Sequence, residues 1–112
     1  DNLTAIVDLN RLQLVDETAA VMPRCEPIKD KWGAFGWHVL EMDGHDVRDI
    51  LSVLDEARQH RDEPTVVISH TIKGKGVSYM ENNVAWHSRG LTDAELDQAI
   101  RELNNAGGPD RE

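Results

Sequence analysis

The amino-acid sequence predicts an α/β fold in which helices pack against a parallel sheet. Strand-like and helix-like stretches alternate in the order strand, helix, strand, helix, strand, helix, which is typical of right-handed crossovers in a parallel sheet. Two of the strands, 3–9 and 64–69, are rich in apolar and β-branched residues, as expected of strands buried on both faces. Polar or glycine-rich residues follow both strands, at the edge where open α/β sheets bind ligands.

The composition predicts one small globular domain. The chain has 112 residues, of which 39% are hydrophobic and 29% charged. Its formal net charge of −9 argues against nucleic acids and anionic membranes as partners. The sequence has neither a recognisable signal peptide nor a long apolar segment. Cys25 is the only cysteine, which excludes an internal disulfide and predicts a reducing compartment, the cytoplasm.

The first predicted strand, 3–9, begins without a polar lead-in. A strand that is this apolar usually has neighbouring strands on both edges. We therefore expect the chain to begin inside a larger domain, either as a fragment or as one piece of a split protein. Asn10 follows at once, and its amide oxygen suits a hard cation such as Mg²⁺. An asparagine that ends a strand or forms a turn is the alternative, which this residue alone favours. The chain from there to Pro27 is expected to be irregular.

A short helix and a second strand are predicted next. Residues 29–35 form an amphipathic helix in which Trp32 and Phe35 share a face. Gly36 suits the C-terminus of this helix. Residues 37–42 then alternate sufficiently to form a strand.

Asp46 is placed to cap a second helix, which ends near His60. The expected buried side of this helix consists of Val47, Ile50, Leu51, Leu54 and Ala57. The histidines in this region have no zinc-binding spacing. His38 and His60 are therefore expected to be structural or exposed, and His45, in a strand-to-helix loop, receives no role.

The third predicted strand, 64–69, leads into the run His-Thr-Ile-Lys-Gly-Lys-Gly at 70–76. Its glycines allow the backbone to pass close to a ligand. Lys73 and Lys75 add positive charge, and the combination suits phosphate oxygens. A plain turn with two solvated lysines explains these residues about equally well.

The last predicted element is a helix that begins with a capping box formed by Thr92 and Glu95. Residues 79–83, before it, show no persistent period and are expected to form a loop. The expected buried stripe of the helix consists of Leu96, Ala99, Ile100 and Leu103. The helix is expected to end at residues 106–109, with a frayed charged tail.

Several separated segments together resemble one enzyme family, the transketolases. Residues 3–13 resemble the second half of the family's thiamine diphosphate motif. Residues 35–39 and 43–46, Phe-Gly-Trp-His-Val and Asp-Gly-His-Asp, resemble the same enzymes, as do 64–77 and the Trp-His pair at 86–87. The likeness spans nearly all of the chain, in the family's order and spacing.

The resemblance implies roles for five residues. Asn10 matches the family's Mg²⁺-ligating asparagine, and Leu12 matches the residue whose backbone carbonyl also binds the metal. Leu14 corresponds to an apolar contact with the cofactor, and Lys73 to a position near the cofactor. His87 matches a histidine near the diphosphate and the reacting centre, which also meets the sugar substrate, and is the catalytic residue implied.

The resemblance also implies that residues 1–112 are the C-terminal portion of a thiamine diphosphate-binding domain. The implied cofactors are thiamine diphosphate and Mg²⁺, and the implied reaction transfers a two-carbon ketol unit between phosphorylated sugars, as in the pentose phosphate pathway. The family's Gly-Asp-Gly half-motif and its pyrimidine-binding domain are not among these residues. Activity is therefore expected only in an oligomer with companion chains that carry them.

Two alternatives stay open. One is another thiamine diphosphate enzyme, such as a deoxyxylulose phosphate synthase or a dehydrogenase component, although residues 35–46 and the pair at 86–87 fit transketolase better. The other is a non-catalytic structural or regulatory remnant. The joint presence of Asn10, Lys73 and His87 argues against such decay.

Overall fold

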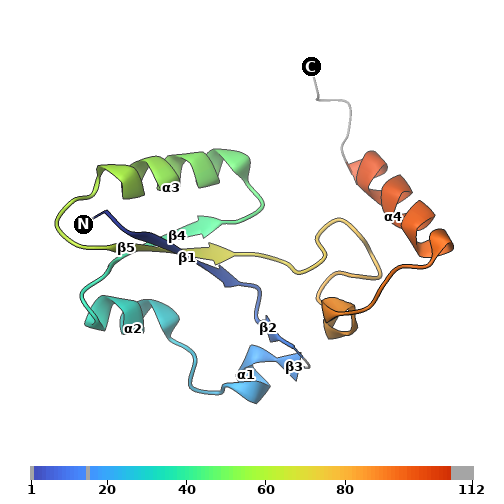
Figure 1. Ribbon diagram of the computed structural model, residues 1–112, viewed down its shortest axis with the longest axis horizontal. Coiled ribbons are helices and arrows are strands. Elements are labelled where there is room, and N and C mark those ends of the chain that lie inside the picture. The colour runs from blue at the N-terminus through green and yellow to red at the C-terminus, as the bar shows by residue number, and fades with distance from the viewer. Residues whose placement is uncertain (1, 15, 107–112) are drawn as a thin grey trace.

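The computed structural model describes residues 2–14 and 16–106, and its centre is a parallel sheet (Figure 1). The strands are, in spatial order, β1 (Thr4–Leu9), β5 (Thr65–His70) and β4 (His38–Asp43). Helix α3 (Val47–Gln59) covers one face of the sheet and α2 (Ile28–Ala34) lies on the other. The remaining elements are β2 (Leu12–Gln13), β3 (Asp16–Glu17), α1 (Thr18–Val21), the 3₁₀ helix η1 (Val84–His87) and α4 (Asp93–Ala106). The predicted α/β fold with a parallel sheet is confirmed.

Strand β5 is the central and most buried strand. It pairs in parallel with β1 on one edge and with β4 on the other. All residues from Thr65 to Ser69 are buried, because both edges are hydrogen-bonded and both faces are covered. The pairing register makes the three strands end in one row, at Leu9, Asp43 and His70. Every loop that leaves this row therefore starts from the same edge of the sheet.

The best-packed part of the core lies between α3 and the sheet. Its buried members are Met42, Val53, Ala57 and Val67. Val47 and Leu51, expected on the buried side of the helix, are 67% and 64% exposed, whereas Val53 is buried. The expected face is therefore partly wrong, because α3 is rotated so that Val53 rather than Leu51 points at the strands.

Strand β1 is an edge strand within the described residues, although its apolar sequence predicts neighbours on both sides. It hydrogen-bonds to β5 alone in this part of the chain. Leu3 and Ile6 are accordingly 56% and 57% exposed. Part of the apolar run that suggested a central strand is thus uncovered, whereas Leu9 at its end is buried.

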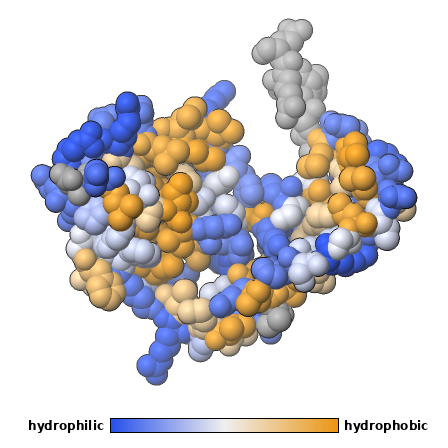
Figure 2. All heavy atoms as spheres, in the orientation of Figure 1, coloured by the Kyte–Doolittle hydropathy of each residue, from blue (hydrophilic) through white to orange (hydrophobic). Residues whose placement is uncertain are grey.

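Helix α4 projects away from the sheet (Figure 1), and hydrophobic residues gather on its surface (Figure 2). Of the predicted buried stripe, Ala99 is buried, but Leu96, Ile100 and Leu103 are 45%, 49% and 50% exposed. That prediction is wrong for these three residues, because the helix stands off the sheet. The molecule is correspondingly flat, at 51 × 42 × 18 Å. Its radius of gyration is 17.0 Å, against about 13 Å for a compact domain of this length.

Both predicted helix caps are present. The Asp46 carboxylate accepts a hydrogen bond from the Arg48 amide at 2.8 Å. The Glu95 carboxylate accepts from the Thr92 amide at 2.9 Å, and the Thr92 hydroxyl accepts from the Glu95 amide at 3.3 Å. The bonds from Thr92, followed by the Arg89 guanidinium, hold the pKa of Glu95 below its usual value. The sequence therefore determines where α3 and α4 begin.

The chain between Asn10 and Pro27 is more regular than expected. Strands β2 and β3 form a small antiparallel hairpin in which Leu12 lies opposite Glu17, and α1 follows directly. At the other end of the chain, the predicted helix end at 106–109 and its charged tail lie beyond the described residues, since α4 is described to Ala106. None of the described helices is long and apolar enough to cross a membrane.

We expect residues 1–112, expressed alone, to aggregate or to form a molten state. In the described structure β1 and β4 have unpaired outer edges, and apolar side chains are exposed on β1 and α4, both of which favour association. Dye binding to exposed apolar surface and near-ultraviolet circular dichroism would measure this state. A sharp, cooperative melt of a lone monomer would contradict the prediction.

Candidate functional site

The five residues singled out in the sequence line one cavity at the carboxyl-terminal end of the sheet. Its volume is about 270 Å³, and its lining consists of Asn10, Leu12, Gln13, Leu14, Lys73, Val84 and His87. These residues come from the loop after β1, the loop after β5 and η1. Because the strands end in one row, segments more than sixty residues apart in the sequence meet at this cavity. Gln13 and Val84 are lining residues that the sequence did not suggest.

The first wall of the cavity is the turn that follows β1. The Asn10 side-chain oxygen accepts a hydrogen bond from the Leu12 amide at 2.9 Å. This bond fixes the direction of the Asn10 amide, and an amide oxygen has a second lone pair that can bind a cation. The intervening residue, Arg11, has a φ of 62°, a left-handed conformation that is uncommon for a residue other than glycine.

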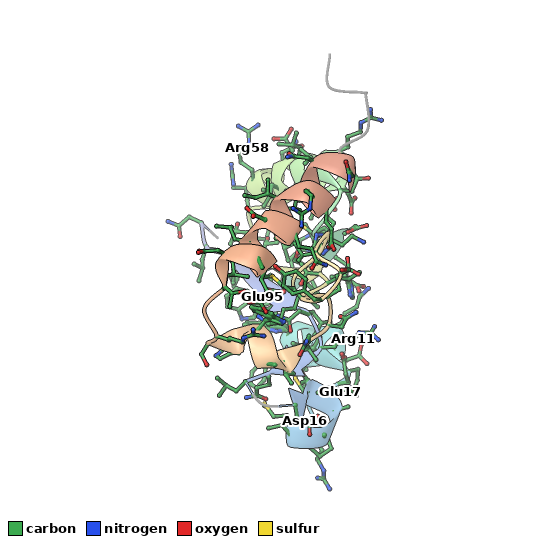
Figure 3. The ribbon with its side chains drawn as sticks, turned by 90° about the vertical axis from the view of Figure 1, so that its right-hand side faces the viewer. Arg11, Asp16, Glu17, Arg58 and Glu95 are labelled. Atoms are coloured by element: carbon green, nitrogen blue, oxygen red, sulfur yellow. The ribbon has the colours of Figure 1, made fainter. Side chains whose placement is uncertain are left out.

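The β2–β3 hairpin continues this wall. Leu14, after β2, has a φ of 45° and is 60% exposed. This left-handed backbone is uncommon for a residue other than glycine and is typical of strained functional loops. The side view places Asp16 and Glu17 toward the lower end of the molecule, below Arg11 and below the start of α4 at Glu95 (Figure 3).

The glycine-rich loop after β5 forms the second wall through Lys73, not through its amides. The amides of Lys75 and Val77 donate to the carbonyls of Ile72 and Gly74, at 3.2 and 3.1 Å. The Gly76 amide donates to the Glu81 carboxylate at 2.9 Å. These three amides are therefore already hydrogen-bonded to acceptors within the protein. Lys75, in addition, is not among the lining residues.

Gly74 in this loop is required by its backbone and by its neighbour. Its φ is 71°, and a Cβ atom at this position would lie 2.6 Å from Cβ of Met80. The next residues therefore fold back closely over the glycine, as the hydrogen bond from the Asn82 amide to the Lys73 carbonyl, at 3.0 Å, also indicates. This close return positions Lys73 at the cavity.

The third wall is η1, which a tryptophan holds in place. The Trp86 indole nitrogen donates to the Tyr79 carbonyl at 2.9 Å, and the Arg89 guanidinium lies 4.2 Å from the Trp86 ring centroid. The Tyr79 hydroxyl donates to the Glu95 carbonyl at 2.6 Å. Trp86 is half-buried by these contacts, whereas His87 is exposed and lines the cavity.

A larger cavity of about 860 Å³ adjoins the first, and the two share Asn10 and Leu12. Its wall includes Glu41, which accepts hydrogen bonds from Lys29 at 2.5 Å and from His70 at 3.0 Å. Lys29, followed by His70, lowers the pKa of Glu41, and Glu41 raises the pKa of Lys29. The sequence did not suggest this group of Lys29, Glu41 and His70. The one feature of the sequence that points to it is the position of His70 at the end of a strand.

His45 also has a position near this edge. Its Nε2 atom accepts a hydrogen bond from the Ile72 amide at 2.7 Å. This nitrogen is thus an acceptor, so the ring supports the glycine-rich loop rather than donating to a ligand through Nε2. His45, to which the sequence pattern assigns no supported role, thus has this local one in the structure.

The chemistry of the smaller cavity fits a metal-bound diphosphate. Asn10 offers an amide oxygen and Leu12 a backbone carbonyl, which are the oxygen ligands that Mg²⁺ requires. Lys73 contributes a compact positive charge, and His87 contributes ring nitrogens that can donate or accept a hydrogen bond. The residues present therefore match the group that the sequence implies.

Comparison with known proteins identifies the family of this chain. A family model described as "Transketolase, thiamine diphosphate binding domain" matches residues 1–107. An apulose-4-phosphate transketolase subunit from Phocaeicola vulgatus is 45% identical over 104 residues, which cover 93% of this chain and 37% of that protein. The 6-deoxy-6-sulfo-D-fructose transketolase subunit SqwG of a Clostridium species is 39% identical over 107 residues, covering 96% of this chain and 38% of that protein.

A solved structure supports the fold. The transketolase of Campylobacter jejuni superposes with a TM-score of 0.83 at 24% identity, over 92% of this chain and 16% of that chain. The chain thus spans well under half the length of each of these relatives. Because the family model covers 107 of the 112 residues, the chain belongs to the transketolase family, within its thiamine diphosphate binding domain.

Proposed function

We propose that this chain is the C-terminal portion of the thiamine diphosphate-binding domain of a transketolase that transfers a two-carbon ketol unit between phosphorylated sugars. The observation that carries the proposal is the single cavity lined by Asn10, Leu12, Leu14, Lys73 and His87. Their types match the needs of a Mg²⁺-bound diphosphate beside a reacting carbonyl compound. Thiamine diphosphate, when bound, supplies the carbon nucleophile for such a transfer.

Each residue has a definite task in this proposal. Asn10 and the Leu12 carbonyl hold Mg²⁺ on the diphosphate, and Lys73 offsets the remaining negative charge. Leu14 gives the cofactor an apolar contact. His87 positions a substrate hydroxyl or carbonyl oxygen and exchanges a proton with it, for which an exposed side chain in the lining of the cavity is suitable.

The proposal requires further protein segments, in the same chain or in a companion chain. The sequence does not contain the Gly-Asp-Gly half of the cofactor motif or a pyrimidine-binding domain, and the activity therefore depends on other segments or subunits. Two relatives are named as transketolase subunits, which supports a split enzyme. The uncovered apolar surfaces of β1 and α4 are consistent with further protein packing there.

The direct test is to assay ketol transfer from a ketose phosphate to an aldose phosphate in the assembly purified with its companion chain. Turnover that depends on both thiamine diphosphate and Mg²⁺ is expected. Cofactor binding without turnover across a panel of sugar phosphates would instead favour a non-catalytic role.

Asn10→Ala is expected to weaken cofactor binding at limiting Mg²⁺ by about 10-fold or more, because it removes one oxygen ligand of the metal. The fold should change little, since the side chain's hydrogen bond is to the nearby Leu12 amide. Calorimetric titration of thiamine diphosphate into the assembled protein measures the effect. The control is Asn104→Ala on the exposed surface of α4. Equal affinity in Asn10→Ala and the control would remove Asn10 from the site.

His87→Ala is expected to lower the turnover number by about 10²–10⁴-fold, the usual contribution of a positioned proton-transfer group, and to raise KM for the sugar donor. His87→Asn retains hydrogen bonding without proton transfer, so it should rescue KM more than turnover. Steady-state kinetics at saturating cofactor, with melting temperatures compared, measure both effects. If both variants stay within a factor of about two of the parent, His87 is a packing residue.

A further inference from the structure

Two histidines and a glutamate form a cluster at the end of the sheet opposite the cofactor cavity. His38 is the first residue of β4, His60 follows the end of α3, and Glu63 lies just before β5. The connections that carry them lie at the amino-terminal ends of the strands, on the left in Figure 1. One ligand atom from each of the three lies within 4.8 Å of the others.

One polar atom of the cluster lacks a hydrogen-bond partner among the described residues. This atom is Nε2 of His60, which is buried. It faces Oε1 of Glu63 at 3.5 Å, which is longer than a normal hydrogen bond. A buried nitrogen without a partner is costly, and an ion placed between these two atoms would satisfy both.

The distances suit a tetrahedral metal ion. Two ligand atoms on a tetrahedral Zn²⁺ ion are about 3.3 Å apart when the bonds are ~2.0–2.1 Å long, close to the 3.5 Å between His60 and Glu63. The His38 ring is stacked on that of His60, with centroids 3.9 Å apart and planes 9° from parallel. His38 must therefore rotate out of the stack for its nitrogen to point at the same ion. His38 is half-buried and lies at the start of an edge strand.

We propose that His38, His60 and Glu63 bind a transition-metal ion of the Zn²⁺ class, with water as the fourth ligand. Two imidazoles and one carboxylate favour Zn²⁺ over Mg²⁺, which prefers oxygen ligands alone. The site is distinct from the cofactor cavity, because no residue lines both. A bound ion would link the start of β4, before α3, to the segment that follows α3, and would so stabilise the folded protein.

The test uses the assembled protein in excess Mg²⁺, with Zn²⁺ titrated against a chromophoric chelator. The parent is expected to bind one more Zn²⁺ ion per copy of this chain than His60→Gln. Replacing Zn²⁺ by Co²⁺ should give the visible absorption of a tetrahedral site in the parent, and thermal unfolding should shift upward with added Zn²⁺. These readouts do not depend on catalysis.

Glu63→Gln keeps the proposal testable if His60→Gln fails to fold, since the Glu63 side chain is 44% exposed. It should weaken Zn²⁺ binding by about 10-fold or more. Asp62→Asn is the matched control, because it removes a neighbouring exposed carboxylate outside the cluster. Equal Zn²⁺ binding by the parent and both cluster variants would overturn the proposal. So would the absence of Zn²⁺ binding in the parent, or an equal loss in the control.

Discussion

The structure depends on the pairing of β5 with both of its neighbours in one register. That pairing buries Thr65–Ser69 completely and makes the three strands end together. The loops that carry Asn10 and Lys73 therefore leave the sheet side by side, although they are far apart in the sequence. A slip of one residue in either pairing would turn the side chains of that strand to the opposite face and would separate these loops. The formation of the cavity therefore depends first on the strand register, and only then on the side chains that line it.

Much of this arrangement could be predicted from local sequence. The β-branched run of β5, the Asp46 cap and the Thr92–Glu95 capping box act over a few residues, and each is found in the structure. The five site residues came instead from a likeness to a known family, because composition and spacing do not indicate which loops meet in space. Asn10 illustrates the difference between these two sources. Its own sequence context favoured a simple turn, and in the structure its side chain does accept a hydrogen bond within a turn, from the Leu12 amide.

The predictions that failed concern contacts with elements distant in the sequence. Periodicity correctly placed Leu96, Ile100 and Leu103 together on one helix face, but it carries no information on whether another element covers that face. The glycine-rich loop shows the same limit of local sequence. The Gly76 amide is occupied by Glu81, a partner that the glycine pattern does not indicate. The Lys29–Glu41–His70 group likewise joins α2, β4 and β5, three elements whose proximity only the fold establishes.

The hydrogen bond from Tyr79 to the Glu95 carbonyl has a mechanical consequence. Tyr79 also holds Trp86 through its own carbonyl, and Ser78 donates to Glu102, further along α4. The orientation of α4 and the position of η1 are therefore coupled through a single short loop. A protein that contacts the exposed apolar face of α4 would restrict the movement of His87 without contacting it. Contact on that face of α4 and the position of η1 are thus linked through the hydrogen bonds of Ser78 and Tyr79.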